Sequence, residues 1–253
     1  MLARQRVGTV ISASSRVFSS SRNVRGEVRS SGAIFDPYEY RGEGGDKALP
    51  PMVTSEGLKI RWGIMRGHLK SGVCAGIIQK HVPKFHASKF PPVANEVFEA
   101  FFEAHRKGDT RALAGLTTEE LYATLKGELN QAKKGGGDRL AFRVLGFKTP
   151  THVLQMREHR KKEISDKQGW GQVTCRLQSE REVVTVDANG REVRPADGEE
   201  VIKTDNVTIG TFEVFFGDDQ KRWRLALLQE LSEAPVISLK KAAETASTTS
   251  RAP

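Results

Sequence analysis

The side chains best suited to chemistry in this chain are basic and aromatic residues that alternate with glycines between residues 58 and 90. Lys and Arg bind phosphate oxygens, and flat or apolar side chains contact bases and sugars. The pattern therefore predicts an extended arm that binds structured RNA. Two alternatives stay open: a short amphipathic helix whose charges only face water, and attachment to an anionic membrane surface. The candidate RNA-binding residues of this arm are Lys59, Arg61, Trp62, Arg66, His68, Lys70, Lys80, Lys84 and Lys89.

A second group of basic residues lies between residues 133 and 162, where nine Lys and Arg stand against two acidic residues. Its densest run supplies four further candidates for RNA binding: Arg157, Arg160, Lys161 and Lys162. This face is predicted to meet RNA or anionic lipid. The alternative is a solvated sheet edge that the lysines protect from aggregation.

The net charge of +9 is confined to the first 90 residues, which hold 15 Lys and Arg against 6 Asp and Glu. Residues 1–30 are rich in Arg and Ser and contain one acid, Glu27, a composition typical of a mitochondrial transit peptide. The run from Arg16 to Ser20 resembles a matrix-protease site, which predicts a cut after Phe18 and a transit peptide of residues 1–18. Residues 19–90 would then remain as the basic extended arm. The alternative is a disordered basic tail that binds RNA directly.

The two cysteines, Cys74 and Cys175, lie far apart and lack C-x-x-C spacing, so the sequence predicts neither a zinc site nor a disulfide framework. A reducing compartment fits this usage. No apolar run reaches the length of about 18–20 residues that a membrane span needs. We therefore expect a soluble protein or one peripheral to a membrane.

The elements that position these residues begin near Pro91, where the periodicity of the apolar side chains becomes helical. Phe98, Phe101 and Phe102 lie on one wide apolar stripe of the helix predicted over residues 93–107. Two further helices are predicted over residues 111–116 and 117–133, and the glycines at 135–137 end the second of them.

From residue 139 the pattern changes to the alternation of strands, in the segments 139–148, 151–164, 170–186, 201–216 and 223–227. Asn189-Gly190 is a hairpin signal between two of these segments. Helices followed by strands predict an α+β fold, in which N-terminal helices pack on one face of a strongly curved, cone-like antiparallel sheet. Residues 232–253 are polar and rich in Ala and Thr, and are predicted to form a disordered tail.

Several segments of this region resemble the C-terminal domain of the matrix tether of the mitochondrial import motor. They are residues 151–157, 170–177 and 187–191, together with the closing segments 212–215 and 222–225. The resemblance covers a little over half of the chain and implies a domain over residues 91–231 with the cone-like fold of nuclear transport factor two. Within this superfamily, the segments are more similar to a constituent of the mitochondrial large ribosomal subunit.

What the resemblance implies is a structural protein near the nascent-chain exit that helps to hold the ribosome at the inner membrane. Its partners would be the large-subunit rRNA, neighbouring mitochondrial ribosomal proteins, and the inner membrane or an insertase. It would reside in the matrix, peripheral to the inner membrane. The alternative is a membrane-associated adaptor of the mitochondrial import or insertion machinery. Deletion of residues 58–90 is expected to release the protein from its particle and leave the domain folded.

A cone-like fold can enclose a pocket, so four titratable residues are candidates for acid–base chemistry: His152, His159, Asp205 and Glu213. A general base needs a protected site and a partner that tunes its pKa. His159 lies in a basic run, His152 precedes a strand, and Glu213 is predicted to face outward between two apolar neighbours. No nucleophile motif, phosphate loop or metal-ligand spacing is present in the sequence. We therefore predict no enzymatic activity, no cofactor and no small-molecule substrate.

Overall fold

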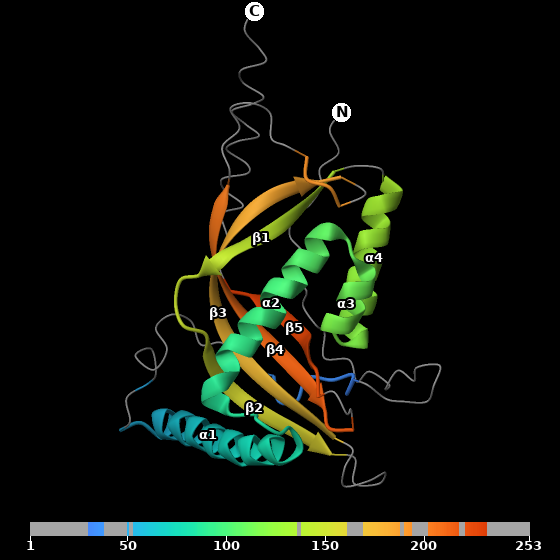
Figure 1. Ribbon diagram of the computed structural model, residues 1–253. Coiled ribbons are helices and arrows are strands. Elements are labelled where there is room, and N and C mark those ends of the chain that lie inside the picture. Colours follow the sequence, from blue (N-terminus) through green and yellow to red (C-terminus); the bar gives the residue numbers. More distant parts are fainter. Residues whose placement is uncertain are drawn as a thin grey trace, which may run out of the picture.

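The computed structural model describes residues 30–37, 50, 53–135, 138–160, 169–187, 190–193, 202–217 and 221–231. Helices come first in the chain and strands follow, as Figure 1 shows. The helices are α1 (Ser55–His81), η2 (Ala87–Lys89), α2 (Phe90–Lys107), α3 (Thr110–Leu116) and α4 (Glu119–Gly135). The strands are β1 (Arg139–Phe147), β2 (His152–Arg160), β3 (Gly169–Val186), β4 (Lys203–Phe215) and β5 (Trp223–Glu230). The predicted α+β fold is confirmed. The predicted transit peptide, its cleavage site, the C-terminal tail, Lys161 and Lys162 lie outside the described residues.

The five strands form one open antiparallel sheet built around the long strand β3. One edge of β3 pairs with β4, which pairs in turn with β5. The opposite edge of β3 pairs with two short strands placed end to end, β2 along residues 169–176 and β1 along residues 179–186. Because β3 is so long, it pairs with both short strands along the same edge.

Helix α2 packs in front of the sheet and supplies most of the aromatic core (Figure 1). Phe98 and Phe102 are buried with their ring centroids 4.8 Å apart, and Phe90 lies edge-on to Trp223 at 4.6 Å. Such pairs add to the hydrophobic gain from burial. The helix ends at Gly108, whose φ of 66° is the left-handed conformation that a C-terminal cap requires.

The segment predicted as an extended arm is largely the 27-residue helix α1. Thr54 caps its first turn by accepting a hydrogen bond from the backbone N–H of Gly57 at 3.0 Å. The inner side of the helix packs on β2 and buries Ser71, Cys74 and Ile78. The expectation of an extended conformation is therefore wrong for residues 55–81, which are helical.

The hydrophobic core also begins earlier in the chain than the predicted domain boundary at residue 91. Ile78, Val82 and Phe85 are buried members of the core. A Cβ atom placed on Gly171 would lie 2.8 Å from the side chain of Ile78, so the end of α1 rests directly on β3. Deletion of residues 58–90 would remove these side chains, and we no longer expect the domain to fold without them.

Candidate functional site

The outward side of α1 carries a stripe of exposed apolar residues, which we call the α1 stripe: Leu58, Trp62, Met65, Leu69 and Val73. They recur every three or four residues and therefore share one face of the helix. Trp62, Leu69 and Val73 are 63 %, 65 % and 66 % exposed. Since Ser71, Cys74 and Ile78 are buried on the sheet, α1 has one apolar side packed inside the protein and another that faces outward.

Basic residues flank the α1 stripe. Lys59 and Arg66 are exposed beside it, and no acidic residue occurs in the sequence between Glu56 and Glu96. The stripe includes a shallow open depression of about 550 Å³. Among the described residues, its lining comes from α1: Arg61, Ile64, Met65, His68, Leu69, Gly72 and Val73. Apolar side chains between cationic borders suit the boundary between anionic headgroups and acyl chains.

The structure distributes the predicted RNA-binding residues over α1 and the turn after it. The exposed ones are Lys59, Trp62, Arg66, His68, Lys70, Lys80, Lys84 and Lys89, and Arg61 is half-buried. Lys70 forms an ion pair with Asp36, at 3.2 Å. Trp62 belongs to the α1 stripe, whereas Lys84 and Lys89 follow the helix, so the candidates do not form one surface. Their binding to RNA stays a prediction.

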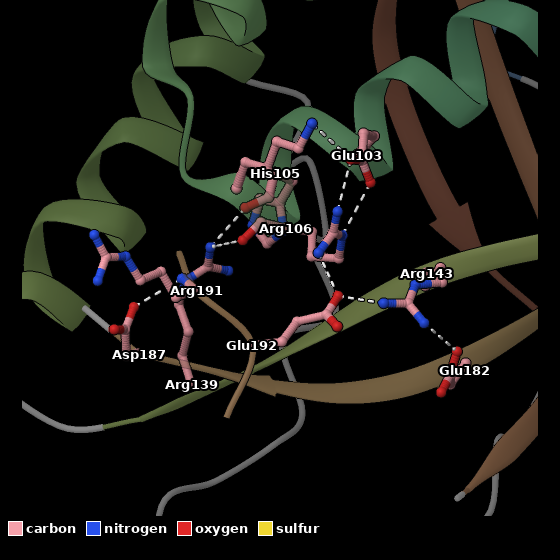
Figure 2. Close-up of polar contacts among 10 residues, drawn as sticks. Glu103, His105, Arg106, Arg139, Arg143, Glu182, Asp187, Arg191 and Glu192 are labelled. Atoms are coloured by element: carbon pink, nitrogen blue, oxygen red, sulfur yellow. Dashed lines mark hydrogen bonds and ion pairs between the residues drawn. The ribbon is translucent and has the colours of Figure 1, made fainter. Parts of the chain in front are cut away.

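Several residues of the second basic stretch are held by internal contacts, and Figure 2 shows those of Arg139 and Arg143. Arg139 donates hydrogen bonds to the backbone carbonyl oxygens of His105 and Arg106, at 2.7 and 2.6 Å, and so caps the C-terminus of α2. Arg143 pairs with Glu182 at 3.0 Å and also with Glu192. These contacts join β1 to α2, to β3 and to the β3–β4 connection.

Three further basic residues of this stretch also have acidic partners: Lys148, just after β1, and Arg157 and Arg160, in β2. Lys148 pairs with Asp205 at 2.5 Å, and Arg160 lies 3.3 Å from Glu158. Arg157 is 6 % exposed, and its guanidinium pairs with Asp36 at 2.8 Å. Buried and paired in this way, Arg157 is a structural cation of the outer face of the sheet, and a surface role for it in RNA binding is not what the geometry supports.

Glu213 was expected to face solvent and is in fact 3 % exposed. It does lie on the face opposite Phe212 and Val214, but residues 30–37 cover that face. Ser31 donates two hydrogen bonds to the Glu213 carboxylate, one from its hydroxyl and one from its backbone N–H at 3.2 Å. The side-chain amide of Gln172 donates a third to the same carboxylate at 2.8 Å. Burial raises the pKa of the Glu213 carboxyl, and these hydrogen bonds offset part of that effect.

The other acid–base candidates do not converge with Glu213. His152 is exposed opposite Arg176, and Asp205 is exposed and bonded to Lys148. His159 stacks on Phe35, with a centroid distance of 4.9 Å. Among the described residues, no group of three or more His, Cys, Asp or Glu could hold a metal ion.

The space between α2 and the sheet is occupied by a charged side chain that the sequence did not single out. Arg181 is fully buried, lies 4.5 Å from the ring centroid of Phe102, and donates to Glu230 at 2.5 Å. It also donates to Ser179 at 2.9 Å. The guanidinium is thus a hydrogen-bonded cation in the space between α2 and the sheet.

A family model for the Tim44-like domain matches residues 76–230. The chain therefore belongs to the Tim44-like domain family, whose members are non-catalytic adaptors and tethers of the mitochondrial inner membrane. This membership indicates a membrane-associated role in mitochondrial import or ribosome tethering, on the matrix side of the inner membrane. No curated protein matches the chain. In the part of the chain that the structure describes, no helix is long and apolar enough to cross a membrane.

Proposed function

We propose that this protein is a structural constituent of the mitochondrial large ribosomal subunit that holds the ribosome at the inner membrane. The observation that carries the membrane half of the proposal is the α1 stripe with its cationic borders. The ribosomal half rests on the similarity of the strand segments to mitochondrial large-subunit ribosomal protein forty-five. In this role it binds rRNA and neighbouring ribosomal proteins and performs no catalysis.

Burial energetics favour lipid contact over exposure of the α1 stripe to water. Moving a large apolar side chain out of water contributes about 1.5–3 kcal/mol. Each Lys or Arg near an anionic surface adds roughly 1 kcal/mol. Trp62 and Leu69 supply the first kind of contribution, and Lys59 and Arg66 the second. Together they give a reversible peripheral attachment that depends on anionic lipid.

The membrane test is flotation of the full chain with vesicles of phosphatidylcholine, with and without cardiolipin. We expect flotation with cardiolipin, and a loss of roughly 100-fold in affinity for the double variant Trp62→Glu, Leu69→Glu, because about 3 kcal/mol of apolar contact disappears. The matched control is Leu145→Glu, at an apolar position of β1 that is 43 % exposed. Equal flotation of the stripe variant and the control would contradict membrane docking by α1.

The ribosomal test is sedimentation of the tagged chain from matrix lysate on a high-salt gradient, with and without RNase. We expect migration with the large subunit, sensitivity to RNase, and weaker association for the triple variant Lys80→Gln, Lys84→Gln, Lys89→Gln. The stripe variant should keep its ribosome association, and the triple variant should still float with vesicles. Migration as a free monomer in moderate salt would refute the ribosomal role.

The second candidate function is an adaptor of the import or insertion machinery, which the family membership favours equally. It predicts that vesicle binding survives RNase and that the chain sediments with membrane protein complexes in place of the large subunit. In both functions the α1 stripe contacts the membrane. The functions differ in the complex that the protein binds there, the large ribosomal subunit or the import or insertion machinery.

A further inference from the structure

Residues 30–37, which we call the strap, cross the outer face of the sheet, opposite α2. The first strap residue, Ser30, donates to Glu120 of α4 at 2.9 Å. The last contacts are made by Asp36, which pairs with Arg157 of β2 and Lys70 of α1. The strap therefore runs from α4, over β4, β3 and β2, to α1.

The sheet beneath the strap presents an ordered row of polar side chains. Arg157, Gln172 and Glu213 are direct cross-strand neighbours on β2, β3 and β4. All three are nearly or fully buried, with exposed fractions of 6 %, 2 % and 3 %. A charged or polar side chain buried without partners would cost several kcal/mol, so this row requires polar atoms from another segment.

The strap supplies these atoms from its backbone. The Gln172 amide accepts from the N–H of Phe35 at 2.9 Å and donates to the carbonyl of Ala33 at 2.7 Å. Gln155 donates to the carbonyl of Asp36 at 2.6 Å. A single glutamine that bonds both backbone groups of a segment is a way of binding a peptide that is independent of its side chains.

Two side chains of the strap add selectivity. The ring of Phe35 stacks on His159, which in turn lies 6.2 Å from the ring of Trp170. The carboxylate of Asp36 accepts from Arg157 at 2.8 Å. Charge-assisted hydrogen bonds of this kind are stronger than neutral ones. The groove therefore prefers an aromatic residue followed by an acidic one.

We propose that the outer face of the sheet is a peptide-binding groove for an irregular segment that contains Phe-Asp, and that its resident ligand is the strap of the same chain. The groove binds by contacts that do not depend on chain connectivity, so the same peptide also binds in trans when the strap is disabled. In the native chain the tethered strap outcompetes free peptide through its high effective concentration. This proposal is independent of membrane docking.

The test uses an acetylated peptide of residues 30–37 with a fluorescent label after Pro37, and the full chain in which Ser31→Ala, Phe35→Pro and Asp36→Ala disable the strap. These changes remove the hydrogen bonds from the Ser31 hydroxyl to Glu213, from the Phe35 N–H to Gln172 and from Arg157 to Asp36. Fluorescence anisotropy should show saturable binding to the strap-disabled chain and binding at least roughly tenfold weaker to the wild-type chain. A peptide carrying Asp36→Asn should bind the strap-disabled chain roughly tenfold more weakly, since it loses the charged hydrogen bond to Arg157.

Adding Arg157→Ala to the strap-disabled chain should abolish the difference between the Asp and Asn peptides, because the two changes remove the same contact. The matched control is Arg143→Ala, another ion-paired arginine of the sheet, which should leave peptide binding unchanged. The Asn peptide keeps the test decisive even where Arg157→Ala fails to fold. Absence of saturable binding, equal binding of both peptides to the strap-disabled chain, or equal binding of the peptide by the wild-type and strap-disabled chains would overturn the proposal.

Discussion

His105 should make the stability of the protein depend on pH between about pH 6.5 and pH 4. Its ring is largely buried near the end of α2, beside Phe101. Burial, with a smaller contribution from the charge of Arg139, lowers the pKa of His105 from 6.5 to about 4. The folded protein therefore holds a neutral imidazole at pH values where the unfolded chain is protonated.

The sign and size of the effect follow from proton linkage. A depressed pKa gives stability that is complete above the unfolded value of 6.5 and is lost as the pH falls towards the folded value of about 4. At about pH 5 the loss amounts to about 2 kcal/mol, and it approaches about 3 kcal/mol at lower pH. Hydrogen bonds from Arg106 and Lys107 lower the pKa of Glu103 to about 2, so that carboxyl changes stability mainly below pH 4.5.

Urea unfolding at about pH 7.5 and about pH 5 measures this directly. The wild-type chain should lose about 2 kcal/mol more between the two conditions than the variant His105→Gln, whose side chain stays neutral throughout. The control His68→Gln, at an exposed position of α1, should keep the wild-type loss. If His105→Gln and the wild type lost the same stability, the imidazole would not be held neutral by burial, and the reasoning would be refuted.

Three further expectations concern the packing of the domain. Gly190→Ala should destabilise the domain by about 2 kcal/mol or more in urea unfolding, because φ at this position is +77° and a Cβ would lie 2.1 Å from the carbonyl oxygen of Lys107. The control Gly127→Ala lies in open space on α4 and should be neutral or stabilising. Arg181→Met should cost about 3 kcal/mol in the same assay, since it leaves buried hydroxyl partners without their donor. Burial raises the pKa of both cysteine thiols, so a disulfide reagent should modify them slowly in the folded protein and rapidly in urea; fast reaction of the folded protein would contradict their burial.

The sheet and α2 could be predicted from the sequence because their patterns are local. Val173, Cys175 and Leu177 alternate along β3 and point to the core, as expected for a strand with one face against a helix. The stripe of Phe98 and Phe102 likewise marked the buried face of α2. In both cases the apolar residues recur with the period of the element that contains them.

Helix α1 was misjudged because two features weaken its periodic signal. Its apolar residues occupy two opposite sides, one against β2 and one facing outward, so no single stripe stands out. The intrinsic helix propensity of α1 is also lowered by four glycines: Gly63, Gly67, Gly72 and Gly76. The helix therefore depends on packing against the sheet for its stability. The sequence feature that does indicate the start of α1 is its N-terminal capping residue, Thr54.

The groove could not be predicted at all, because its partners are far apart in sequence. Alternation correctly assigns Glu213 to the face opposite Phe212, and a one-sided sheet would leave that face in water. What buries Glu213 is Ser31, which lies 182 residues earlier in the chain. Nothing local to either residue indicates the other.

The residues that match the family model differ from those that form the α1 stripe and the strap. The match covers residues 76–230, which includes Gln172 and Glu213 of the groove and all five strands. The α1 stripe and the strap both precede residue 76. The family scaffold therefore provides the sheet, whereas the preceding segments provide the α1 stripe, which we propose faces the membrane, and the strap. Asp36 of the strap pairs with both Lys70 of α1 and Arg157 of β2, so the strap links α1 to the sheet. The segment that occupies the groove therefore also helps to orient the helix that we propose meets the membrane.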